Sequence, residues 1–133
     1  MIKVVLDTNV YLSGIIFGGK PKIILSLIQS NKLQNYTSLQ ILLELSDKLH
    51  QKFLWTALDV QYALKAISIT SIVIKPKLPL TVIRQDPTDN KILECARDAK
   101  VDYIITGDKH LLQLKRFGGI EIVRPGEFLK KMV

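Results

Sequence analysis

Cysteine and histidine are scarce in this sequence, which limits the cross-links and metals it can use. The 133 residues include one cysteine, Cys95, and two histidines, His50 and His110. One cysteine cannot form an intrachain disulfide, so a disulfide-bonded secreted domain is excluded and we expect a cytoplasmic protein. Zinc sites are built mainly from cysteine and histidine, so zinc has almost no ligands here. We expect Cys95 to be a small core residue and His110 to lie at the surface.

Long hydrophobic runs are also lacking. No apolar run approaches the roughly 18 to 20 residues that a membrane helix needs. The stretch Met1–Leu6 reaches the charged Asp7 too early for a signal peptide. The sequence therefore predicts no membrane association.

The composition fits one small domain with more apolar surface than it can easily bury. Hydrophobic residues make up 47% of the chain and charged residues 23%, and the mean hydropathy is +0.20. A chain of this length predicts a single domain, residues 1–133. Because small domains bury a limited fraction of their surface, the hydropathy favours a homodimer or a hydrophobic partner.

Basic residues outnumber acidic ones, giving a net charge of +7 and a pI near 9.6. Excess positive charge favours polyanions such as nucleic acids, although a generically basic soluble protein has the same composition. The basic residues gather in three groups: Lys20 and Lys22; Lys75, Lys77 and Arg84; and Lys109, Lys115 and Arg116.

Strand-like and helical segments alternate along the chain. Apolar and β-branched runs predict strands at 2–6, 35–38, 69–74, 101–106 and 120–123. Helical spacing and capping signals predict helices at 21–30, 39–53, 59–66, 87–99 and 109–116, and from 125 onward. Asp86 is expected to cap the helix at 87–99, and Gly14, Gly18 and Gly19 are expected to break up the segment after the first strand. This alternation predicts a three-layer α/β domain with a mostly parallel central sheet flanked by helices.

Four acidic residues are expected near the carboxyl ends of the strands: Asp7, Glu44, Asp89 and Asp108. In doubly wound folds, ligands bind outside this edge of the sheet. Three of them have a purely structural alternative. Asp108 could cap a helix, Asp89 could form a capping box with Asp86, and Glu44 could be a solvated helix residue. Asp7 fits such an alternative less well, because it directly follows a buried strand and its desolvation is costly.

Taken together, the four acids predict a metal site. Carboxylates gathered in one crevice repel each other unless a cation neutralises them. Oxygen ligands favour hard ions, so we expect Mg²⁺ or Mn²⁺. An acidic metal pocket in a basic protein suits a nuclease, in which metal ions activate water while surrounding lysines bind the phosphate backbone.

The motifs around these acids resemble those of the PIN-domain family in order and spacing, over nearly the whole chain. The Asp-Pro-x-Asp-Asn stretch followed by Thr-Gly-Asp is the most specific part. Within the family, the chain is most similar to the VapC-like toxins of prokaryotic toxin–antitoxin systems. The stretches that carry the resemblance are Leu6-Asp7-Thr8-Asn9, Leu43-Glu44-Leu45, Asp86-Pro87-Thr88-Asp89-Asn90-Lys91-Ile92-Leu93 and Ile105-Thr106-Gly107-Asp108.

The resemblance implies a metal-dependent endoribonuclease that hydrolyses RNA phosphodiesters, with RNA and an antitoxin protein as partners. It implies that one or two Mg²⁺ or Mn²⁺ ions are held by a catalytic quartet: Asp7, Glu44, Asp89 and Asp108. Asn9 and Thr106 match polar positions that orient the acids or water. Glu44 is the loosest match, because Asp47 lies one turn further along the same expected helix.

Several alternatives stay open or are disfavoured. A haloacid-dehalogenase-like phosphotransferase needs a second aspartate two residues after the first, where this chain has Asn9. A receiver domain needs an aspartate after the third strand, where this chain has Lys75-Pro76. A catalytically silent PIN scaffold or RNA-binding module, and a housekeeping RNA-processing nuclease, stay open. The apolar stretch Phe53-Leu54-Trp55 is expected in the core, with a dimer or antitoxin surface as the alternative.

Overall fold

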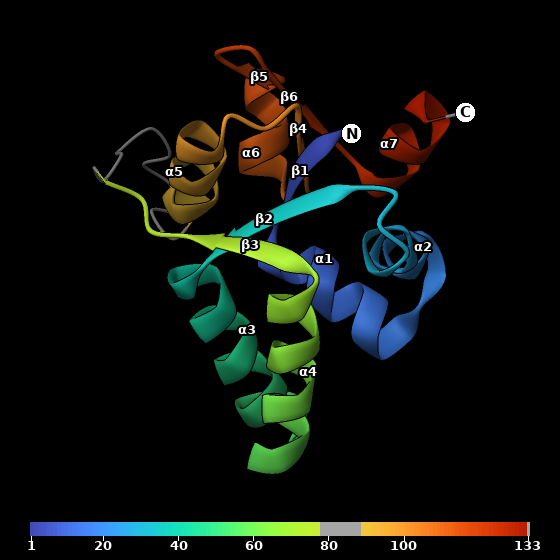
Figure 1. The fold of residues 1–133 in the computed structure, drawn as a ribbon, viewed down its shortest axis with the longest axis vertical. Helices are drawn as coiled ribbons and strands as arrows, with labels where there is room; N and C mark the ends of the chain where they lie inside the picture. The colour runs from blue at the N-terminus through green and yellow to red at the C-terminus, as the bar shows by residue number, and fades with distance from the viewer. Residues whose placement is uncertain (78–88, 133) are drawn as a thin grey trace.

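The computed structural model describes residues 1–77 and 89–132, which form a six-stranded sheet with helices on both faces (Figure 1). The strand order is β3-β2-β1-β4-β6-β5, and only the β5–β6 pair is antiparallel. The strands are β1 (Lys3–Leu6), β2 (Gln34–Ser38), β3 (Ser71–Ile74), β4 (Tyr103–Ile105), β5 (Arg116–Phe117) and β6 (Ile120–Val123). The expected three-layer, mostly parallel α/β fold is confirmed.

Helices in the crossovers between parallel strands form the two outer layers. The helices are α1 (Thr8–Leu12), the π-helical η1 (Ser13–Phe17), α2 (Gly19–Gln29), α3 (Leu39–Gln51), α4 (Ala57–Ile69), α5 (Asn90–Ala99), α6 (Lys109–Leu114) and α7 (Pro125–Lys131). In Figure 1, α5 lies above β2 and β3, whereas α3 and α4 lie below these strands. The C-terminal α7 packs against α2.

The central strand β1 determines where the candidate site lies. Val4, Val5 and Leu6 are fully buried, as expected for a strand covered on both faces. Leu6 pairs with Ile105 of the parallel strand β4. The residues that directly follow this pair, Asp7 and Thr106, therefore leave the sheet side by side at its carboxyl edge.

The core contains the expected cysteine. Cys95 is buried on α5 together with Ile92 and Ala96. Burial raises the pKa of its thiol to about 12, so the thiol stays protonated and unreactive at neutral pH. The prediction of a core role for Cys95 is confirmed.

The segment after Asp7 is more regular than its glycines suggest. Instead of a broken loop, the chain forms α1 and η1. A Cβ atom on Gly14 would lie 2.6 Å from the Leu25 side chain, so this glycine allows η1 to pack closely against α2. Gly14 therefore serves close packing, and the expectation of a break there is wrong.

Two element boundaries also differ from the prediction. Helix α4 continues to Ile69, so the following strand begins only at Ser71. Helix α6 ends at Leu114 instead of near Arg116, and β5 then forms a hairpin with β6. Gly118 makes this turn possible with a φ of +62°. The expected cap at Asp86 lies outside the described residues.

Some apolar side chains expected in the core lie on the surface. Leu54 is 82% exposed, so the core prediction is wrong for it, whereas Phe53 and Trp55 are partly buried against the core. In α3, Leu39 and Leu43 are also exposed. The residues that α3 buries are Ile41, Leu42, Leu45 and Leu49.

Within the described residues, no single helix has the length and hydrophobicity to cross a membrane. The consecutive segments Thr8–Phe17 and Gly19–Gln29 qualify by length and composition only when joined, and they are bent by 101°.

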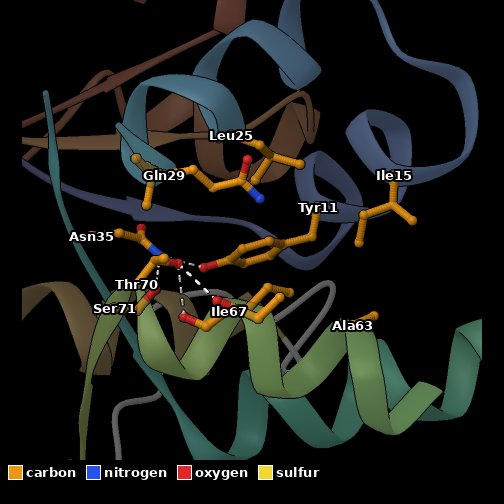
Figure 2. A pocket seen from close by; sticks show the side chains of 11 residues that line it. Tyr11, Ile15, Leu25, Gln29, Asn35, Ala63, Ile67, Thr70 and Ser71 are labelled. Carbon is orange, nitrogen blue, oxygen red and sulfur yellow. Dashed lines mark hydrogen bonds between the residues drawn. The ribbon is translucent and has the colours of Figure 1, made fainter. Parts of the chain in front are cut away.

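A buried polar link ties α1 to the amino-terminal ends of β2 and β3 (Figure 2). The Asn35 side-chain Nδ2 donates to the Tyr11 hydroxyl and to Ser71 Oγ, each at 2.8 Å. Tyr11 is fully buried, and burial raises the pKa of its hydroxyl to about 12 although the hydrogen bond from Asn35 opposes the shift. Burial, and not the hydrogen bond from Asn35, therefore keeps Tyr11 neutral at pH 7.

We expect Tyr11→Phe to lower the free energy of unfolding by about 1 kcal/mol, because a buried amide loses one of its acceptors. The raised pKa also means that Tyr11 contributes stability present below its unfolded pKa of 10.0 and lost as the pH rises towards about 12. Urea unfolding at pH 7 and at several values between pH 9 and 12 measures both effects. Tyr62→Phe is the control, since Tyr62 is 66% exposed. Equal stability of Tyr11→Phe and the control would contradict the role of this link.

Candidate active site

Asp7 is a buried carboxylate at the carboxyl edge of the sheet. It is 4% exposed, and its backbone N–H donates to the Ile105 carbonyl at 3.0 Å. It occupies the N-cap position of α1, but its side chain makes no capping hydrogen bond. The carboxylate instead accepts a hydrogen bond from Thr106 Oγ1 at Oδ2, at 2.7 Å. The main chain therefore fixes Asp7, and its carboxylate is available for a purpose other than capping.

Asp108 joins this arrangement through Thr106. The Asp108 backbone N–H donates to Thr106 Oγ1 at 3.0 Å. The threonine hydroxyl therefore makes hydrogen bonds with both aspartates. Asp108 also caps α6, because its Oδ1 accepts from the N–H groups of His110 (2.8 Å) and Leu111 (3.2 Å). The helix-capping role considered for Asp108 is thus confirmed. Both capping bonds end on Oδ1, so the cap does not use Oδ2.

Glu44 is held near these aspartates by basic side chains. It projects from α3, and its Oε2 lies 3.0 Å from Lys91 Nζ at the start of α5. Lys48, one turn further along α3, lies 4.0 Å from the other carboxylate oxygen. Partial burial raises the pKa of Glu44, but the Thr8 hydroxyl, the bond and charge of Lys91 and the charge of Lys48 together outweigh it and hold the pKa below its usual value. Glu44 is therefore an ion-paired carboxylate and not a freely solvated one.

Electrostatics show that the acids act on one another. The pKa of Asp7 is raised, mainly by burial and then by the charges of Asp108 and Glu44. The hydrogen bond from Thr106 and the charge of Lys91 oppose this shift. Because an ionised Asp7 is costly in these surroundings, a cation beside it would stabilise the site.

The two remaining predicted residues lie in different environments. Asp89 is 7% exposed and immediately precedes α5, two residues before Lys91. Its position places it at the same edge of the sheet, because the lysine that follows it contacts Glu44. Asn9 is exposed on α1, and its Oδ1 accepts from Lys48 Nζ at 3.1 Å. Asn9 therefore contacts a base that flanks the acids.

Sequence reasoning missed Lys48 and Lys91, which both reach Glu44. Lys91 lies within the Asp-Asn-Lys part of the motif, so its nearness to Asp89 was a usable signal. The contact with Glu44 joins residues 47 positions apart and needs the folded chain.

The donor chemistry of these residues fits a hard divalent metal ion. The carboxylates and the threonine hydroxyl supply only oxygen atoms, which Mg²⁺ and Mn²⁺ prefer. Within residues 1–77 and 89–132, however, no three acidic, histidine or cysteine side chains converge closely enough to form a metal site as they stand. These side chains supply the oxygen atoms that such an ion prefers. To surround one ion, the carboxylates must move closer together.

A second candidate is a cavity of about 120 Å³ at the amino-terminal edge of β2 and β3 (Figure 2). Tyr11, Asn35 and Ser71 form its polar end, and its other walls are mostly apolar. The Tyr11 hydroxyl is a poor acid or base at neutral pH because burial raises its pKa to about 12. This cavity has room for a small molecule, but its groups are not suited to catalysis. The acidic edge is the better candidate active site.

Comparisons with known proteins identify the family and the fold. A family model for the PIN domain matches residues 3–110, a range that includes all four predicted acids. An uncharacterized protein of Methanocaldococcus jannaschii is 43% identical over 120 residues, covering 86% of this chain and 76% of that protein. A chain in the crystal structure of VapBC2 from Rickettsia felis, bound to a DNA fragment from its promoter, has a TM-score of 0.64 and 16% identity. That match covers 91% of this chain and 97% of the other, and at such low identity it shows a shared fold. By the family match, which covers more than half of its length, the chain belongs to the PIN-domain family.

Proposed function

We propose that this protein is a Mg²⁺- or Mn²⁺-dependent endoribonuclease that hydrolyses RNA phosphodiesters, and that it is the toxin of a toxin–antitoxin pair. PIN domains are in general nucleases, which supports the reaction class. The observation that carries the proposal is the buried Asp7 carboxylate, whose pKa is raised by burial and by the neighbouring charges of Asp108 and Glu44. Such a carboxylate is suited to binding a cation at the edge where α/β folds bind ligands.

In the proposed reaction, Asp7, Glu44, Asp89 and Asp108 hold the metal. When bound, the metal supplies an activated water and neutralises charge on the phosphate that is attacked. Thr106 fixes the Asp7 carboxylate through its 2.7 Å hydrogen bond. Lys48 is 37% exposed and is steadied by Asn9, so its amine is placed to bind the RNA backbone.

The proposed partners are RNA, an antitoxin protein and a second copy of the chain. The similar structure from Rickettsia felis is that of VapBC2, a toxin–antitoxin complex, which supports an antitoxin partner. Three exposed apolar side chains, Leu58, Tyr62 and Ile69, lie on one face of α4 at helical spacing. This face supports the proposal of a homodimer, because a small domain rarely leaves such a stripe in water.

We expect RNA cleavage with Mg²⁺ or Mn²⁺, none with EDTA, and a loss of more than about 100-fold in Asp7→Asn. Even residues that only support metal ligands cost about 10- to 100-fold when they are changed, so a ligand should cost more. The measurement is the single-turnover cleavage rate on a panel of structured RNAs. Asp47→Asn, which changes an exposed acid on α3, is the control and should keep its activity.

Cleavage that survives both EDTA and Asp7→Asn would contradict the metal mechanism. If Mn²⁺ binds but no RNA in the panel is cut, the catalytically silent RNA-binding module becomes the better description. Growth arrest on expression, relieved by a neighbouring gene, would separate a toxin from an RNA-processing nuclease.

We expect Thr106→Val to reduce the cleavage rate by about 10- to 100-fold, because it removes the hydroxyl that orients Asp7 and accepts from the Asp108 N–H. Thr106→Ser retains the hydroxyl and should recover most of the activity. Thermal melting of both variants separates a local effect from unfolding. Equal activity of the valine and serine variants would show that the hydroxyl does not position the acid.

We expect a solution mass near twice the 15.1 kDa of one chain, measured by light scattering after size-exclusion chromatography. Replacing Tyr62 with glutamate should shift the mass to that of a monomer, because it places a charge in the exposed apolar face of α4. Lys32→Glu, at an exposed position outside α4, tests for a general charge effect. A monomeric wild-type protein would contradict the homodimer.

A further inference from the structure

An internal cation already lies within the acidic site. Lys91 Nζ is 3.0 Å from Glu44 Oε2, and the lysine side chain is only 15% exposed. Lysine is seldom this buried unless it is paired, so the ion pair is part of the packing between α5 and α3. One oxygen of a predicted metal ligand is therefore occupied by an amine of the same chain.

The two lysines that reach Glu44 are not equivalent. Lys48 is 37% exposed, lies 4.0 Å from Glu44 and donates to Asn9. Lys91 is closer and less exposed, and it follows Asp89 on the same turn of chain. Its charge also acts at Asp7, where it opposes the effects of Asp108 and Glu44. Lys91 thus contributes positive charge between several carboxylates.

The ion pair with Lys91 uses one oxygen of Glu44 at an edge where the acids lie apart. Glu44 is drawn towards Lys91, and no three metal-binding side chains converge within the described part of the chain. The Lys91 amine lies 3.0 Å from Glu44 Oε2, whereas Mg²⁺ lies about 2.0–2.1 Å from the oxygens that bind it. The positive charge of Lys91 therefore competes with a divalent ion for the Glu44 carboxylate.

We propose that Lys91 is a built-in counter-ion of the acidic site that competes with a divalent ion for Glu44. The inference rests on the proposed function, because it takes Glu44 to be a metal ligand. Lys91 lowers the affinity for the metal and in exchange prevents the carboxylates from repelling each other when the metal is absent. It is a positioning residue that acts through Glu44.

The test is a comparison of Mn²⁺ affinity and metal-free stability among variants at fixed pH and salt. Mn²⁺ dissociation constants are measured by electron paramagnetic resonance, and melting temperatures are measured with EDTA and with Mn²⁺. We expect Lys91→Met to bind Mn²⁺ at least about 5-fold more tightly, because it removes a positive charge a few ångströms from the ligands. Its metal-free form should melt at a lower temperature than the wild type, and Mn²⁺ should stabilise it more.

Two further variants test whether Lys91 and Mn²⁺ compete for Glu44. Lys32→Met removes a positive charge at the opposite edge of the sheet, where Lys32 is exposed, and should leave the Mn²⁺ affinity unchanged. In a Glu44→Gln background, Lys91→Met should tighten Mn²⁺ binding far less, because the carboxylate for which the two cations compete is gone. Lys91→Arg retains the charge and serves as the folded comparison if Lys91→Met does not fold; it should bind Mn²⁺ no more tightly than the wild type.

The outcomes separate this inference from the proposed function. If the wild type binds Mn²⁺ but Lys91→Met binds it equally or more weakly, Lys91 does not compete with the metal and the inference is overturned. An arginine variant that binds more tightly than the wild type would also overturn it. If the wild type neither binds Mn²⁺ nor cuts RNA, the proposed function fails and the inference fails with it.

Discussion

The site depends on the parallel pairing of β1 with β4. This pairing brings Asp7 and Thr106 to the same edge of the sheet, although they are 99 residues apart, and allows the 2.7 Å hydrogen bond between them. The same threonine hydroxyl accepts from the backbone of Asp108, so the start of α6 is tied to the end of β1. A slip of this register by one residue would turn Thr106 to the other face of the sheet and separate it from Asp7. The central strands thus determine the geometry of the acids more than the local sequence does.

The predicted site gathers negative charge in a molecule whose net charge is positive. The chain carries a net charge of +7, yet its carboxylates gather where burial and mutual repulsion raise the pKa of Asp7. Lys91 and Lys48 partly offset this charge from two different helices. Two lysines that are not themselves predicted ligands therefore offset part of the negative charge of the site.

Helix α1 connects the two edges of the sheet. Asp7 immediately precedes it at the acidic edge, and Tyr11 is buried one turn later beside the amino-terminal ends of β2 and β3. The hydrogen bonds of Asn35 to Tyr11 and to Ser71 fix this turn against two strands. The close approach of η1 to α2 at Gly14 then packs the following segment against α2. The rigid packing of α1 supports the position of the carboxylate that precedes it.

The sequence by itself determined the order of strands and helices, the parallel sheet, the burial of β1 and Cys95, and the motifs that identify the family. These features follow from local hydrophobic patterns and from residues close together in the chain. The ends of α4 and α6, the exposure of Leu54 and the helical path after Asp7 were missed, because packing between distant segments decides them. Only the tertiary structure decided that Asp108 caps α6 through one oxygen, and that Asn9 contacts Lys48. The tertiary structure also decided that Lys91 pairs with Glu44. This ion pair joins residues 47 positions apart, so it leaves no periodic signal in the sequence. It forms only once α5 packs against α3.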